Sequence, residues 1–212
     1  AIPFLPIAIS RLVDAHPGVF LSAIEERETE LPDRSRKRDI ELAILRLSLV
    51  EPGEDMQVLP LFNEKLCVVA SKTHPLATRH NLQWAELLQQ RWVMSPADCF
   101  FYEFVQRTLD RLDMPMPHHV VEALSIQAQF GLVLHAGMLG FGMRSGLQFA
   151  PGKEFVVRLP FDLPVVGHDV SAVMLKSHAP SPLAQQLVGH IRDLVAESSP
   201  LRTVAHSMAA GD

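Results

Sequence analysis

Short apolar segments, each with the length of a buried strand, alternate with amphipathic helical segments along most of the 212 residues. Residues 40–45 (IELAIL) and 66–70 (LCVVA) are apolar runs typical of buried strands. Residues 6–15, 101–112 and 182–197 instead repeat apolar side chains at the three- and four-residue spacing of a helix. This alternation predicts an α/β fold with largely parallel sheets.

Shorter patterns and turn residues predict further elements. Ser125 is suited to cap a helix that runs to about His135. Residues 25–38 are polar and charged, and their basic run 34–38 lies among acidic residues, which favours ion pairs on a solvated face over a phosphate contact. We also expect a helix over 84–88 and strands over 19–24, 57–62, 92–94, 119–122, 139–143, 155–159 and 169–175.

The composition limits the class of protein. Hydrophobic residues make up 48% of the chain, enough for a globular core, while the net charge of -5 argues against a surface that holds nucleic acid. Cys67 and Cys99 are too few for a disulfide framework, and we expect reduced, packed thiols, as in a cytoplasmic protein. Apolar runs stay below the roughly 18–20 residues needed to cross a bilayer, so no membrane partner is expected. Because Ala1 is no natural start, we expect that an upstream portion has been removed.

The sequence contains no recognisable motif of a catalytic or cofactor-binding site. Residues 142–146 (GMRSG) place their serine one position late for a nucleophile elbow, so we interpret them as a turn. Gly137, Gly140 and Gly142 follow a helix, which favours a helix stop and a strand entry over a nucleotide-binding loop. The ten histidines are scattered, and neither HExxH nor CxxC occurs. The sequence therefore predicts no metal, no cofactor and no enzymatic activity.

Two positions follow buried strands, where α/β sheets bind ligands beyond the carboxyl ends. Arg46 comes directly after 40–45, and its guanidinium is suited to hold a carboxylate or, equally, to form a structural salt bridge. Ser95 and Pro96 follow 92–94, where a hydroxyl and free backbone N–H groups at a helix start form an anion site. A plain helix cap is the alternative for this second position.

Five segments occur in a characteristic order. They are FLPIAISRLVDAHPGV (4–19), RDIELAILRL (38–47), LPLFNEKLCVVASKTHPLA (59–77), LQWAELLQQRWVMSP (82–96) and SIQAQFGLVLHAGMLGFGM (125–143). Each is a weak motif alone, but in this order and spacing they resemble the effector-binding domain of LysR-type transcriptional regulators. The resemblance extends over about residues 3–197.

This resemblance implies a two-lobed fold like that of the type II periplasmic binding proteins, with a cleft between the lobes. Lobe I would comprise residues 1–61 plus 161–212, and lobe II residues 62–160. The implied function is a non-catalytic, cytoplasmic sensor that binds a small effector, expected to be an organic anion, in the cleft. The implied partners are a second copy in a homodimer, a tetramer at full length, and DNA only through a winged helix-turn-helix domain that these residues do not contain.

The resemblance also implies which residues form the site, although the chain departs from the family pattern at several positions. Residues 1–3 are at most a remnant of the family's first strand, and Arg38 and Glu41 stand where the family often has glycine and aspartate. The alternatives are a free solute-binding protein, for which no signal peptide is visible, and a small α/β enzyme. The residues at positions that line the family's cleft, and thus the expected effector contacts, are Arg46, Ser95, Pro96, Ser125, Phe141 and Met143.

Overall fold

The computed structural model describes residues 4–47, 50–149, 154–163 and 168–198. The chain divides into two compact units, each with its own sheet. Unit 1 comprises Ala1–Glu64 and Gly167–Asp212, and unit 2 comprises Lys65–Val166. The expected remnant of a first strand at residues 1–3 lies outside the described residues.

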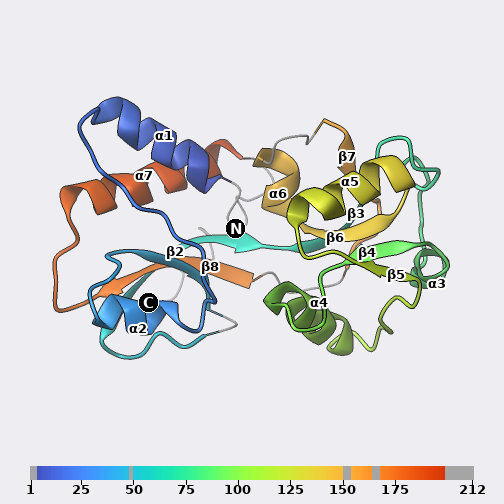
Figure 1. Cartoon of the computed structure of the whole chain (residues 1–212), viewed down its shortest axis with the longest axis horizontal. Helices are drawn as coiled ribbons and strands as arrows, with labels where there is room; N and C mark the ends of the chain where they lie inside the picture. The colour runs from blue at the N-terminus through green and yellow to red at the C-terminus, as the bar shows by residue number, and fades with distance from the viewer. Residues whose placement is uncertain (1–3, 48–49, 150–153, 164–167, 199–212) are drawn as a thin grey trace, which may run out of the picture. The chain divides into compact units, whose positions relative to one another are not determined.

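Unit 1 is an antiparallel sheet covered by helices on both faces (Figure 1). Helices α1 and α7 lie side by side and are linked by the ion pair between Arg11 and Glu197. On the other face, Leu31 of α2 packs against an apolar cluster that includes Leu45 and Val173. In strand order β1-β8-β2, the elements are β1 (Ala43–Arg46), β8 (His168–Leu175), β2 (Met56–Glu64), α1 (Leu5–Ala15), α2 (Leu31–Arg36) and α7 (Pro182–Glu197).

Unit 2 contains a mixed five-stranded sheet. Strands β5, β4 and β6 run parallel, whereas β3 is antiparallel to both β6 and β7. Helix α5 packs on β3 and β4, and its Val133 joins the buried cluster around Val69 and Val93. In strand order, the elements are β5 (Val120–Glu122), β4 (Trp92–Met94), β6 (Leu139–Met143), β3 (Leu66–Ser71) and β7 (Val156–Arg158), with α3 (Trp84–Leu88), α4 (Phe100–Asp110), α5 (Ile126–Ala136) and α6 (Arg144–Phe149).

The α/β class is confirmed, but several details of the sequence prediction are wrong. The sheet of unit 1 is antiparallel, because β8 lies between β1 and β2 and runs against both. Residues 19–24 form no strand, and Phe20 among them is 93% exposed. Arg46 is the last residue of β1 rather than the residue after it. Residues 144–149 form helix α6, so the expected turn over 142–146 is in fact the end of a strand and the start of a helix.

Within the described residues, no helix is both long and apolar enough to span a bilayer.

Candidate functional site

Three parallel strands of unit 2 end at one edge of the sheet, and each is followed by a helix. Strand β4 ends at Met94 and leads through Ser95 to α4, and β5 leads through Ser125 to α5. Strand β6 ends at Met143 and continues directly into α6. Because the carboxyl ends of parallel strands and the amino ends of helices are favourable places for polar ligands, this edge is the candidate site.

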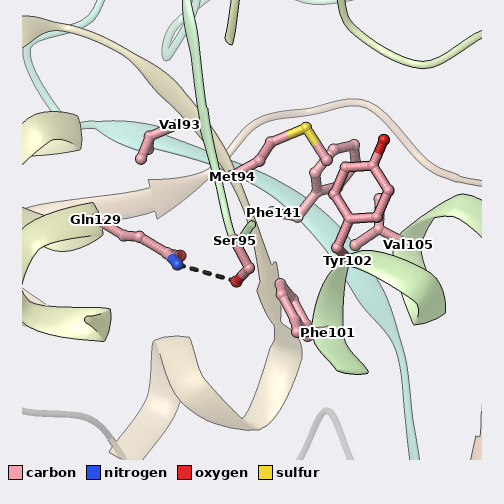
Figure 2. A pocket seen from close by; sticks show the side chains of 8 residues that line it. All are labelled: Val93, Met94, Ser95, Phe101, Tyr102, Val105, Gln129 and Phe141. Atoms are coloured by element: carbon pink, nitrogen blue, oxygen red, sulfur yellow. Dashed lines mark hydrogen bonds between the residues drawn. The ribbon is translucent and has the colours of Figure 1, made fainter. Parts of the chain in front are cut away.

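A small hollow lies at this edge between β4, β6, α4 and α5 (Figure 2). Its cavity volume is about 10 Å³, enough for roughly one water molecule. Ser95 supplies a hydroxyl that is only 8% exposed, so the polar group is almost enclosed by apolar walls. The lining residues are Val93, Met94, Ser95, Phe101, Tyr102, Val105, Gln129 and Phe141.

The polar part of the hollow is a pair of hydrogen-bonded side chains. Gln129 of α5 donates from Nε2 to Ser95 Oγ at 3.0 Å, as Figure 2 shows. The same nitrogen donates to the backbone carbonyl of Ala123 at 2.7 Å. No acidic, basic or histidine side chain is among the lining residues, so the hollow offers hydrogen bonds and aromatic surface but no formal charge. Ser95 has an amide rather than a base as its neighbour, which is unlike an activated nucleophile.

Aromatic side chains form one wall of the hollow and extend behind it. The rings of Phe141 and Trp92 stack at 4.8 Å, and Trp92 meets Trp84 edge-on at 5.7 Å. Trp84 in turn stacks on Phe161 at 5.7 Å. Each indole N–H is satisfied, by the carbonyl of Leu87 for Trp92 and by that of Pro115 for Trp84. This packing fixes Phe141 in place and puts both tryptophans of the chain close to the hollow.

The structure brings only some of the predicted site residues together. Ser95 and Phe141 both line the hollow, and Pro96 follows Ser95 directly. Ser125 is exposed, and its hydroxyl accepts from the N–H of Ala128 and donates to Gln127, so it serves as the expected helix cap. Met143 is half-buried and pairs with Leu66 across the sheet. Neither Ser125 nor Met143 lines the hollow, and their role as effector contacts stays a prediction.

Arg46 lies in unit 1 and is already paired. Its guanidinium forms an ion pair with Glu28, whose other carboxylate oxygen accepts the backbone N–H of Arg46 at 2.8 Å. The two side chains are only 12% and 13% exposed. This arrangement is the structural salt bridge that the sequence left open as the alternative, and an effector contact at Arg46 stays a prediction.

Sequence reasoning missed six of the eight residues that line the hollow, including three that supply its aromatic and polar surface. Phe101 and Tyr102 belong to α4, and Gln129 lies one helical turn after the cap Ser125. The helical pattern of residues 101–112 identified the buried face of α4 but not which of its aromatic residues face the edge of the sheet. A polar residue in the apolar segment 126–136 was the available signal for Gln129.

His74 contacts Gly137 at the C-terminal end of α5, and this contact makes the stability of unit 2 dependent on pH. Its Nδ1 accepts the N–H of Leu76 at 3.1 Å, so the ring is neutral in this arrangement. Partial burial lowers the pKa of His74 below 6.5, while a hydrogen bond with the backbone of Gly137, which ends α5, opposes part of that shift. Protonation would remove the acceptor for the Leu76 N–H.

We expect the free energy of unfolding to fall as the pH drops below about 6.5, partly because His74 becomes protonated. In His74→Gln, the contribution of His74 to this decrease should be absent. The unfolded imidazole has the higher pKa and takes up a proton first as the pH falls. The contribution of His74 is therefore present above 6.5 and is lost below it. Urea unfolding between pH 7.5 and 5 measures the difference. Identical pH slopes for both proteins would show that His74 contributes nothing.

Comparisons with known proteins agree on one family. The family model described as LysR substrate binding domain matches residues 1–196. The HTH-type transcriptional regulator GalR of Pseudomonas putida is 26% identical over 195 residues, which are 92% of this chain and 49% of the relative. The transcriptional dual regulator GltC of Bacillus subtilis is 27% identical over 181 residues, or 85% of this chain and 59% of the relative. The chain thus spans about half the length of these curated relatives.

Solved structures show the same fold at low identity. The BenM effector binding domain with its effector benzoate has a TM-score of 0.69 and 19% identity, covering 92% of this chain and 86% of that one. The CcmR regulatory domain of Synechocystis PCC6803, in complex with 2-PG, has a TM-score of 0.69 and 18% identity, covering 90% of each chain.

Proposed function

Because the chain belongs to the LysR substrate binding domain family, we propose that it is the ligand-sensing part of a transcriptional regulator and binds a small organic anion. The observation that supports this proposal is the enclosed Ser95–Gln129 pair among aromatic walls, at the sheet edge where three parallel strands end. A hydroxyl and nearby helix amino ends suit an anionic group, and the aromatic rings suit an apolar body. The benzoate of BenM combines these two features.

The hollow has room for about one water molecule in this form, so we propose that a ligand enters by moving its walls apart. Phe101 and Tyr102 are half-buried side chains in the first turn of α4, and they are the walls that we expect to move. Phe141 is held by its stack on Trp92 and stays in place. We propose no catalysis, because Ser95 has no base beside it among the described residues.

The further partners of the regulator are also proposals. We propose a cytoplasmic homodimer, with DNA bound only through a part of the regulator outside this chain. Large apolar side chains exposed in each unit support contact with a second copy. They are Val13, Phe20 and Ile24 in unit 1, and Val121, Leu124, Ile126 and Phe155 in unit 2.

We expect benzoate, 2-PG or another small organic acid to bind, and this binding to raise the melting temperature and change the tryptophan fluorescence. Ser95→Ala should weaken the binding of the acid about 10-fold. The loss corresponds to one hydrogen bond from the hydroxyl to the ligand. Trp84 and Trp92 make fluorescence a suitable measurement because both are in the aromatic wall.

The matched control is Ser177→Ala, which makes the same chemical change at an exposed position of unit 1. It should leave the affinity unchanged. The proposal fails if no acid in a broad panel binds at millimolar concentration, or if Ser95→Ala and Ser177→Ala bind alike.

A further inference from the structure

The side-chain amide of Gln129 is fixed in one orientation by its two partners. The carbonyl oxygen of Ala123 can only accept a hydrogen bond, so the atom 2.7 Å from it is the amide nitrogen. The same nitrogen lies 3.0 Å from Ser95 Oγ. Its two hydrogens are therefore both used, one for the backbone of the loop between β5 and α5 and one for the serine at the end of β4.

This orientation determines what the Ser95 hydroxyl can do. A hydroxyl has one hydrogen to donate, and its oxygen has two lone pairs that can accept. Since Nε2 of Gln129 provides no lone pair, the serine oxygen accepts from it and the hydroxyl hydrogen stays available. Within the described residues, Ser95 makes no other side-chain hydrogen bond, and it lines the hollow together with Tyr102 and Phe141.

We infer that Gln129 is a positioning residue that makes the Ser95 hydrogen available to a ligand, so that the hollow binds ligands with an acceptor group more tightly than those with only donors. The inference rests on the proposed function and narrows its ligand class. The acceptor is a carboxylate or a neutral group of the same shape, such as a nitro group. A donor-only ligand can reach only the second lone pair of the serine oxygen, so it leaves the enclosed serine hydrogen without an acceptor, and this unsatisfied donor is the basis for discrimination between similar ligands.

The arrangement is tested without any ligand by nuclear magnetic resonance of the glutamine side-chain amides. Both amide hydrogens of Gln129 should exchange with solvent more slowly than those of the exposed Gln106 of α4. In Ser95→Ala, one of the two hydrogens should lose its protection and the other, held by Ala123, should keep it. Exchange as fast as that of Gln106, or a Ser95→Ala variant that changes neither hydrogen, would overturn the inference.

The selectivity is tested with two neutral probes of similar size, nitrobenzene as acceptor and aniline as donor. The unmodified protein should bind nitrobenzene about 10-fold more tightly, the value of one hydrogen bond. In Gln129→Glu the new carboxylate accepts the serine hydrogen, the serine oxygen then faces the ligand, and the preference should disappear or reverse. Gln129→Met, which has no hydrogen-bonding group to orient the serine, should reduce the ratio of affinities.

The two probes distinguish a failure of the inference about Gln129 from a failure of the proposed function. A purely structural role of Gln129 would weaken both probes equally and leave the ratio unchanged, which would overturn the inference. If neither probe nor any organic acid binds the unmodified protein, the proposed function fails. The hydrogen exchange of the Gln129 amide needs no ligand, and it still shows whether Gln129 donates to Ser95.

Discussion

Trp92→Ala is expected to lower the free energy of unfolding by about 3–5 kcal/mol, the range for deleting a large buried aromatic side chain. Trp92 is 0% exposed, lies in the central part of the unit 2 sheet, and stacks on Phe141. The substitution leaves a cavity between β4, α3 and β6, and it leaves the carbonyl of Leu87 without the indole N–H that it accepts. Urea unfolding followed by circular dichroism measures the loss.

Phe20→Ala is the matched control, because it deletes another aromatic ring at a position that is 93% exposed. Its effect should stay within about 0.5 kcal/mol. Trp92→Phe keeps most of the apolar contact and should give an intermediate loss. If Trp92→Ala and Phe20→Ala unfold at the same urea concentration, Trp92 is not in the core of unit 2.

Strong, long patterns in the sequence predicted their elements well. Helix α7 has the predicted bounds, because Ser181 caps it and the apolar residues Leu187, Ile191 and Leu194 lie on one buried face. The short strand β4 was also predicted, since its three residues are all apolar and all buried. Local chemistry suffices for such elements, because α7 has a clear helical period and residues 92–94 are an apolar run too short for a helix.

The errors occur where the outcome depends on partners elsewhere in the chain. Residues 19–24 have the composition of a strand, but a strand needs a neighbour, and Phe20 remains in solvent. Arg46 has the same flanking sequence whether it binds a ligand or pairs with Glu28, which lies 18 residues earlier. The hollow likewise depends on Gln129 reaching Ser95, a contact between residues 34 positions apart. Periodicity carries no information on such contacts, so they emerge only from the fold.

Glu28→Gln is expected to lower the free energy of unfolding by about 3 kcal/mol, because removing one partner of a buried ion pair leaves the other charge uncompensated. Glu28 and Arg46 are 13% and 12% exposed, so water compensates little. Glu28 also accepts the backbone N–H of Arg46 at the end of β1, and a neutral amide accepts this hydrogen bond more weakly than a carboxylate. Urea unfolding again gives the value.

The exposed pair between Arg107 and Glu103 on α4 provides the comparison, since its side chains are 60% and 52% exposed. Glu103→Gln should cost less than about 1 kcal/mol. The double variant Glu28→Leu/Arg46→Met should recover part of the stability lost in Glu28→Gln, because it leaves no charge uncompensated. The recovery is incomplete because the backbone N–H of Arg46 loses its acceptor. Equal effects of Glu28→Gln and Glu103→Gln would mean that the Arg46 pair is solvated.

The result also decides how Arg46 is to be tested as an effector contact. If Glu28→Gln is strongly destabilising, a loss of binding in Arg46→Ala must be measured on protein shown to be folded, because loss of the fold alone would abolish binding.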